Sequence, residues 1–160
     1  MQVIWQILVT PLRAQTFSMA SHLSDNGGTL FRKEIRMRPH EKLDVWMKSV
    51  DLVVRIYKAT EQFPKEEKFG LTSQVRRAAV SVPANIAEGA GRRSEKEFAY
   101  FLSNAQVSAS EVETELLIAS RLGYLNPIIF SELQKNLDHI GQMLHGLARH
   151  LRAKSGTVNR

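Results

Sequence analysis

The histidines of this 160-residue chain are natural candidates for chemistry, because imidazole binds metals and moves protons near neutral pH. Three of the five, His139, His145 and His150, fall in one stretch near the end of the chain. Their spacings of six, five and eleven residues do not cluster them on one helical face, as metal ligands at i and i+4 would be. We therefore interpret them as solvated surface side chains and predict no metal site.

The carboxylates and hydroxyls give no catalytic arrangement either. Glu111, Glu113 and Glu115 alternate, so on a helix they point in three directions, and no Glu-x-x-His motif of the di-iron type accompanies them. Ser81 and Ser94 have no partnered His and Asp that would activate them. The chain also has no cysteine, which removes thiolate nucleophiles and disulfides and suits a reducing cytoplasm. The sequence predicts a cytoplasmic protein that is not an enzyme and needs no cofactor.

Basic side chains are the remaining candidates for function, because guanidinium groups match phosphate oxygens. The predicted nucleic-acid-binding residues are Arg76, Arg77, Arg92, Arg93, Lys96, Arg149 and Arg152. A solvated basic face with ion pairs to Glu95 or Glu97 is the alternative interpretation. The net charge of +6 permits an anionic partner without requiring one, and without residues 1–36 the chain keeps 18 basic and 14 acidic residues.

A polar ladder lies between the two arginine pairs, along a helix predicted over residues 71–90. At 100° per residue, Ser81, Asn85 and Glu88 share one narrow arc beside an apolar face. Pro83 should break a helix at a cost of roughly 3 kcal/mol, yet the apolar pattern resumes in register, which predicts a kinked helix. Gly89 and Gly91 are predicted to end it.

The ladder has two interpretations. In the first, Ser81 and Asn85 satisfy the carbonyls that Pro83 frees, while Glu88 bonds a neighbouring helix or subunit. In the second, the ladder is a face that binds a nucleotide or another small molecule. The first is favoured, because unsatisfied polar groups at a kink are costly.

Three further helices are predicted over residues 40–62, 94–122 and from 126 onward. Ser94 and Glu97 form a capping box, Gly123 is a stop signal, and Asn126 followed by proline is a helix start. Four helices with short links and no strand signal predict an all-α antiparallel four-helix bundle, up-down-up-down, over residues 37–154. Residues 155–160 should fray. No apolar run approaches the ~20 residues of a membrane span.

Two of the predicted helices carry more apolar surface than one core needs. Over 40–62, the expected core face is Leu43, Trp46, Met47, Val50, Val53, Val54 and Tyr57. A second stripe lies on nearly the opposite side of this helix and of helix 94–122, and it is the predicted oligomer interface: Val45, Leu52, Ile56, Tyr100, Val107 and Ile118. Such a patch is larger than monomers usually expose, and contact between two different faces can close a ring.

The string VRRAAVSVPANIAEGAGRRSEKEFAYFL, residues 75–102, contains Ser81-x-Pro83-x-Asn85-Ile86-Ala87-Glu88-Gly89. It closely resembles the signature of the bacterial four helix bundle protein family. That family includes proteins encoded in intervening sequences of large-subunit ribosomal RNA, and it is related to the accessory variability determinant of diversity-generating retroelements. The resemblance extends from about Met37 to about Arg152. It implies homopentameric barrels of four-helix protomers. Resemblance to the intervening-sequence proteins implies ribosomal RNA as the partner. Resemblance to the retroelement protein implies a reverse transcriptase with its template RNA.

Residues 1–36 lie outside the resemblance, and we predict that they are a loose extension or precede a native start at Met37; a docking tail is the alternative. For the remainder, the prediction is a non-enzymatic oligomer that binds nucleic acid, RNA more than DNA, or a protein–RNA complex. The competing hypothesis is a structural homo-oligomeric scaffold that recruits a protein partner such as a reverse transcriptase.

Overall fold

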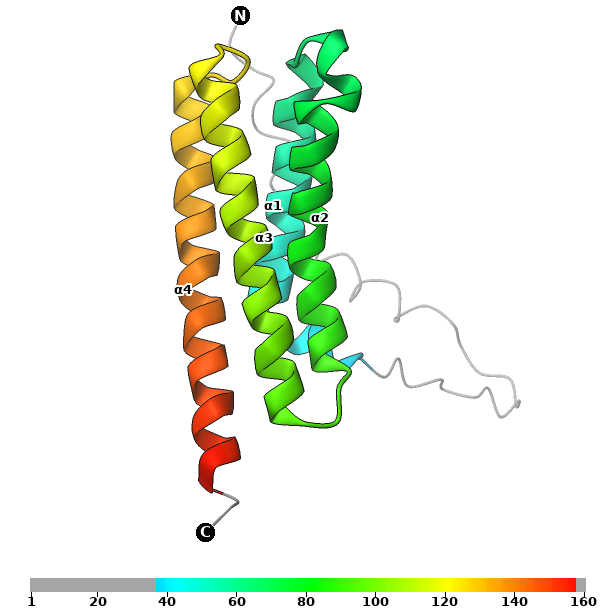
Figure 1. The fold of residues 1–160 in the computed structure, drawn as a ribbon, viewed down its shortest axis with the longest axis vertical. Helices are drawn as coiled ribbons and strands as arrows, with labels where there is room; N and C mark the ends of the chain where they lie inside the picture. Colours follow the sequence, from blue (N-terminus) through cyan, green and yellow to red (C-terminus); the bar gives the residue numbers. More distant parts are fainter. Residues whose placement is uncertain (1–36, 158–160) are drawn as a thin grey trace, which may run out of the picture. The chain divides into compact units, whose positions relative to one another are not determined.

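The computed structural model describes residues 37–157, with side chains up to Lys154, and these residues form an all-α four-helix bundle (Figure 1). The helices are α1 (Asp44–Ala59), α2 (Leu71–Ala90), α3 (Glu95–Arg121) and α4 (Pro127–Thr157). Short 3-10 turns stand around α1 and before α2: η2 (Pro39–Lys42), η3 (Thr60–Gln62) and η4 (Lys65–Phe69). The single helix expected over 40–62 is therefore α1 with a 3-10 turn on either side. The expectations for residues 1–36 and 158–160 lie outside the described part.

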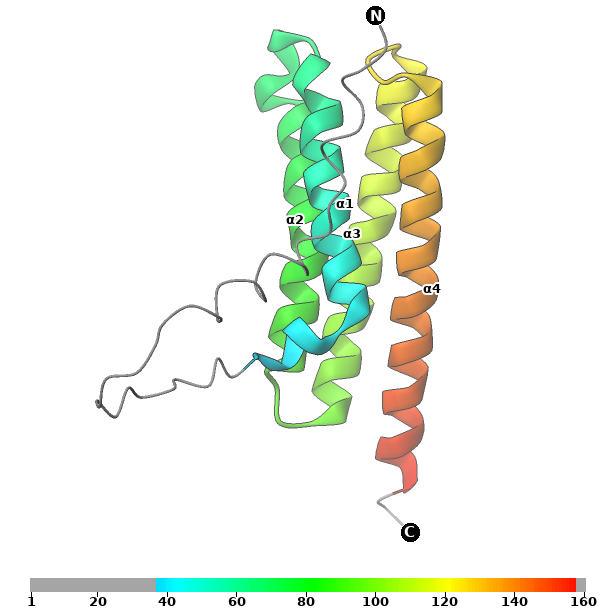
Figure 2. The same cartoon turned by 180° about the vertical axis from the view of Figure 1, so that it is seen from behind.

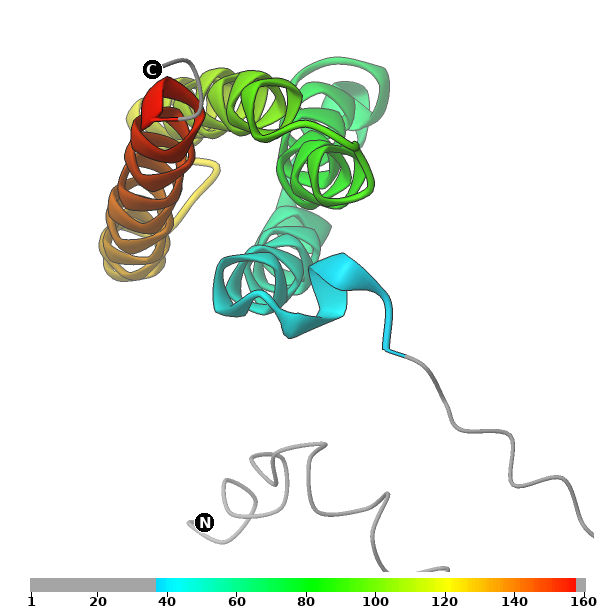
Figure 3. The same cartoon turned by 90° about the horizontal axis from the view of Figure 1, so that it is seen from below.

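Consecutive helices run in opposite directions, as the two opposed views show (Figures 1 and 2). Seen from below, α3 lies between α2 and α4, and α1 lies beyond α2 (Figure 3). The α2–α3 and α3–α4 pairs are the most extensive, while α1 contacts both α2 and α4. The predicted antiparallel four-helix bundle is confirmed.

Local signals in the sequence place the helix ends. The Glu97 amide donates to Ser94 Oγ at 3.2 Å, and the Ile128 amide donates to Asn126 Oδ1 at 2.8 Å, so both predicted N-caps form. The predicted capping box is only half made, because Glu97 Oε2 accepts from the Ser94 hydroxyl, at 2.7 Å, rather than from the Ser94 amide. Gly123 has φ +76°, the left-handed conformation that glycine adopts without steric cost. α4 extends to Thr157, three residues beyond the predicted end of the bundle.

α2 continues through Pro83 to Ala90, as the resumed apolar pattern predicted. Gly91 ends the helix as predicted, but in a right-handed conformation with φ −85° rather than the left-handed one expected of it, and the prediction for Gly89 is wrong. Gly89 lies inside the helix and faces α3. A Cβ on Gly89 would lie 2.6 Å from Cδ2 of Phe98 and 2.8 Å from Cβ of Phe101. Glycine is required there because α2 and α3 approach closely, not because the helix stops.

The core is built from one apolar stripe of each helix. The inward stripes of α2, α3 and α4 contain Val75, Leu102 and Leu144, which are fully buried. The prediction for α1 is wrong in part. Leu43, Trp46 and Val53 do pack against the core as predicted, but the most deeply buried stripe of this helix is the one predicted as interface. Val45, Leu52 and Ile56, predicted as interface, are 3%, 2% and 0% exposed, whereas Met47, Val54 and Tyr57, predicted as core, are exposed.

One polar residue, Ser49, belongs to the buried stripe of α1. It lies in the middle of the buried stripe, and its hydroxyl donates to the Val45 carbonyl at 2.6 Å, so the polar group is satisfied within its own helix. Because the hydroxyl is satisfied, the serine does not prevent this stripe from packing inside the bundle. Within residues 37–157, no helix combines the length and apolar content needed to cross a membrane.

Candidate nucleic-acid interface

Five of the predicted basic residues gather at one end of the bundle, where the α2–α3 turn lies near the last turns of α4 (Figure 1). Two contacts between α3 and α4 establish this proximity. Arg152 Nη2 donates to Ser103 Oγ at 3.0 Å, and Lys154 Nζ lies 3.3 Å from Glu95 Oε1. We call this region the basic end and define it by Arg92, Arg93, Lys96, Arg149 and Arg152.

Arg92 is oriented by its neighbours at the end of α2. Its guanidinium forms an ion pair with Glu88 and lies 4.8 Å from the centre of the Phe101 ring. An exposed ion pair at i and i+4 adds at most about 0.5 kcal/mol to stability. This contact therefore orients the guanidinium but contributes little to the stability of the bundle. Within the protomer Glu88 pairs with Arg92 rather than with a neighbouring helix, and a bond to a neighbouring subunit stays a prediction.

Arg93, Lys96 and Arg149 are exposed and have no hydrogen-bond or ion-pair partner among the described side chains. A cation without a protein partner gives up no such contact when it binds a phosphate. These three side chains are thus the ones at the basic end that are most available to an anionic ligand.

Arg76 lies apart from the basic end and links α2 to the end of α1. Its Nε donates to Thr60 Oγ1 at 2.8 Å, its Nη2 donates to the Tyr57 carbonyl at 3.2 Å, and its guanidinium lies 4.7 Å from the Tyr57 ring centre. These contacts give Arg76 a structural role at the α1–α2 connection. The sequence could not reveal them, because the partners lie 16 and 19 residues away.

Arg77 faces a carboxylate pair on α3. Burial raises the pKa of the Glu115 carboxyl, the neighbouring charge of Glu111 raises it further, and the charge of Arg77 opposes both. Glu115 Oε2 is buried and has no hydrogen-bond partner in the described part of the chain. The attraction from Arg77 therefore only partly offsets the cost of keeping this carboxylate charged.

The polar ladder of α2 is a contact with α3. Asn85 Nδ2 donates to the Ser81 carbonyl at 2.8 Å and to Ser81 Oγ at 3.0 Å, and Ser81 Oγ is 2.9 Å from Ser108 Oγ of α3. The prediction that Asn85 satisfies a carbonyl freed by Pro83 is wrong. The freed carbonyl is that of Ala79, whose i+4 partner would be the missing N–H of Pro83, whereas Asn85 bonds the carbonyl of Ser81. Ser108, the partner of Ser81 on α3, could not be identified from the sequence, because the two residues lie 27 positions apart.

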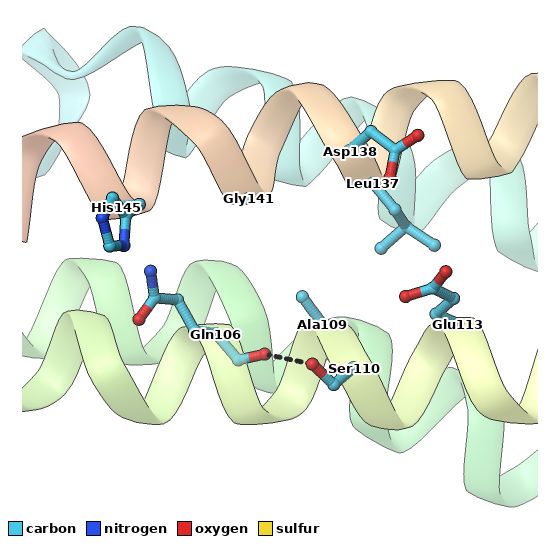
Figure 4. Close-up of a pocket in the computed structure, with 8 residues that line it drawn as sticks. All are labelled: Gln106, Ala109, Ser110, Glu113, Leu137, Asp138, Gly141 and His145. Atoms are coloured by element: carbon cyan, nitrogen blue, oxygen red, sulfur yellow. Dashed lines mark hydrogen bonds between the residues drawn. The ribbon is translucent and has the colours of Figure 1, made fainter.

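A groove of about 310 Å³ lies between α3 and α4 (Figure 4). Gln106 and His145 point toward one another at one end, and Glu113 and Asp138 lie at the other. Two of the lining residues are joined by a hydrogen bond, in which Ser110 Oγ donates to the Gln106 carbonyl at 3.2 Å. This groove presents no nucleophile with an activating base. In the part of the chain that the structure describes, no three His, Asp or Glu side chains are grouped so as to hold a metal ion.

Two exposed apolar surfaces remain on the outside of the bundle. On α3, Tyr100, Val107 and Ile118 are exposed, as the predicted second stripe requires. On α1, the exposed apolar residues are Met47, Val54 and Tyr57. Two different helices therefore offer apolar surface outward, although the residues on α1 are not those predicted.

The fold and surfaces define a class: a four-helix bundle whose described surface carries clustered basic and apolar residues. Residues 41–146 match the model of the 23S rRNA-intervening sequence protein family, so the chain belongs to that family, and the resemblance seen in the sequence is confirmed.

A solved structure from Bacteroides thetaiotaomicron VPI-5482, described as a protein with unknown function from the S23 ribosomal protein family, has a similar fold. It is 26% identical, with a TM-score of 0.59, over 65% of this chain and 97% of the other. No curated protein matches this chain. Neither description names a catalytic activity.

Proposed function

We propose that this protein is a non-enzymatic, self-associating four-helix bundle that binds RNA, or a protein–RNA complex, through the basic end. The observation that carries the proposal is the grouping of five cationic residues around the α2–α3 turn and the end of α4. Three of these, Arg93, Lys96 and Arg149, have no partner among the described side chains. Membership of a family described by ribosomal RNA intervening sequences supports RNA as the ligand.

Self-association multiplies this surface. A single bundle with a small net positive charge binds nucleic acid weakly, whereas several basic ends on one particle bind with avidity. We propose that the α3 surface with Tyr100, Val107 and Ile118 contacts the α1 surface of a second copy. Because the two surfaces differ, the contact is heterologous and can close a ring, and the resemblance favours a closed ring of five copies.

The second candidate function is a scaffold that recruits a protein partner such as a reverse transcriptase. The exposed apolar residues of α1 and α3 support it, because apolar surface of this kind also fits a protein partner. In that case the basic end would have no nucleic-acid ligand.

Fluorescence anisotropy of a labelled short structured RNA across a salt series tests the proposal. The triple variant Arg93→Ala, Lys96→Ala, Arg149→Ala should weaken binding and flatten the dependence of log K on log salt by about 2 to 3, since each lost phosphate contact removes ~0.7–0.9 from the slope. A matched variant removes three cations elsewhere, Lys58, Lys65 and Lys135, and should keep most of the slope. Equal affinity of wild type and triple variant at all salt concentrations would contradict the proposal.

A further inference from the structure

A groove between α1 and α4 is lined by none of the residues of the basic end. Its volume is about 110 Å³. α1 contributes Lys48, Asp51 and Arg55 to its walls, and α4 contributes Asn136 and His139. Its floor is formed by the apolar side chains of Leu52 and Ile140, which are 2% and 1% exposed.

The donors around this groove are uncommitted. Lys48, Arg55 and His139 have no hydrogen-bond or ion-pair partner among the described residues, although Asp51 lines the same groove. Asn136 Nδ2 donates to the Glu132 carbonyl at 2.7 Å, which holds the amide along α4. Arg76, Arg92 and Lys154, by contrast, are already engaged by protein atoms.

The spacing of the two cations suits one small anion. Lys48 and Arg55 are seven residues apart, or about two turns and ~10.5 Å along the axis of α1, within reach of a shared ligand for such long side chains. The imidazole of His139 donates an N–H whether neutral or protonated. Lys48, Arg55 and His139 are themselves exposed to solvent, so these electrostatic contacts are screened and should weaken as salt rises.

We infer that this groove binds one phosphodiester group of RNA. The inference rests on the proposed function, because RNA is the source of the phosphodiester. It adds a second contact with RNA, on a different side of the bundle from the basic end. Asp51 decides which class of anion fits the groove. Lys48 and Arg55 carry two positive charges and Asp51 one negative charge, so the formal net charge is +1 when the imidazole is neutral. This charge matches a phosphodiester, which is a monoanion, better than a terminal phosphate, which is a dianion. Asp51 therefore acts against more highly charged anions.

The first experiment probes the groove without RNA. Dimethyl phosphate and inorganic phosphate are titrated into the full-length protein while NMR records the His139 ring and the Asn136 side-chain amide. Dimethyl phosphate should shift both signals, and the shifts should vanish in Lys48→Ala, Arg55→Ala. In Asp51→Asn the preference for dimethyl phosphate over inorganic phosphate should decrease. Unmoved signals in the wild-type protein would overturn the inference.

The second experiment uses a single-stranded RNA and anisotropy across a salt series. Lys48→Ala, Arg55→Ala should reduce the salt slope by about 0.7, the value for one phosphate on a single strand. The control Lys58→Ala, Lys135→Ala removes the same charge from α1 and α4 outside the groove and should leave the slope nearly unchanged. Equal slopes in the two double variants would overturn the inference.

The two experiments separate the failure of the groove from the failure of the proposed function. If RNA binds wild type and the groove variant alike, and the NMR signals do not move, the groove is wrong and the proposed function stands. If dimethyl phosphate shifts the signals but the protein does not bind RNA, the diester site stands, while the proposed function and RNA as the source of the diester are both wrong.

Discussion

Gly89 of α2 lies against Phe98 of α3 so closely that a Cβ at position 89 would be 2.6 Å from the ring carbon Cδ2. The same Cβ would lie 2.8 Å from Cβ of Phe101, an atom attached directly to the helix backbone. This contact sets how closely α2 and α3 approach next to the turn that carries Arg92 and Arg93. The glycine is therefore linked to the position of the basic end.

Gly89→Ala should destabilise the bundle by about 1–3 kcal/mol, because overpacking outweighs the ~1 kcal/mol that alanine gains over glycine inside a helix. Urea unfolding followed by circular dichroism measures the change. Gly146→Ala is the matched control, since it lies inside α4 and a Cβ there meets nothing within 4 Å. It should stabilise by about 0.5–1 kcal/mol. A neutral or stabilising Gly89→Ala would refute the close contact.

Arg76→Ala should also lower stability, by about 1–2 kcal/mol, because it removes the hydrogen bonds to Thr60 and Tyr57 and the packing on the Tyr57 ring. Arg76→Lys should not restore the loss, since an ammonium cannot reproduce the two-pronged geometry of guanidinium. The neighbouring Arg77→Ala should change the free energy of unfolding by no more than about 0.5 kcal/mol. If both alanine variants unfold at the same urea concentration as wild type, Arg76 has no structural role.

Glu115 should make stability depend on pH. Its pKa is raised in the folded protein by burial and by Glu111, so the folded state holds the proton more tightly than the unfolded chain. Stability from this group is therefore greatest below its unfolded pKa and falls as the pH rises through the folded pKa.

Glu115→Gln removes that penalty and should raise the Tm at pH 7 by about 1–2 °C, with no difference near pH 3.5. Thermal unfolding at the two pH values measures this effect. Glu132→Gln, an exposed carboxylate on α4 with no close charged partner among the described residues, is the control and should give no rise. A Glu115→Gln variant that is less stable than wild type at pH 7 would show that the carboxylate has a partner.

The exposed apolar surface of α3 should govern self-association. Val107→Ser with Ile118→Ser should shift the protein toward monomers without lowering its Tm as a folded bundle, since both side chains are exposed in the single protomer. Sedimentation velocity measures the shift. Ile128→Ser at the start of α4, where the side chain is 70% exposed, is the control and should leave the assembly unchanged. Assembly that survives the double change would place the interface elsewhere.

How much of the fold could be predicted depends on how many apolar stripes a helix carries. α2 and α4 have one dominant stripe, so their inward faces followed from spacing alone. α1 has two, and spacing alone does not show that the stripe interrupted by Ser49 is the inner one. Only the structure shows that the Ser49 hydroxyl bonds the Val45 carbonyl and is buried without penalty.

The candidate interface divides in the same way. The sequence identified the five cations that define the basic end, because charge is a property of residue type, but not Lys154, which pairs with Glu95 beside them. It could not separate Arg76 from Arg93, because the difference lies in contacts with residues distant in the sequence, Thr60 and Tyr57. The groove with Lys48 and His139 was missed for the same reason, as it forms only when α1 and α4 pack together.

The central claim, a ring of bundles that binds RNA through its basic ends, is tested most directly by light-scattering mass. The purified protein is measured alone and with a short structured RNA across a salt series. The account predicts a mass several times the 18.1 kDa protomer, bound RNA at low salt that is released as salt rises, and loss of RNA in Arg93→Ala, Lys96→Ala, Arg149→Ala without loss of the ring. A monomer, or a ring that binds no RNA at low salt, would contradict it.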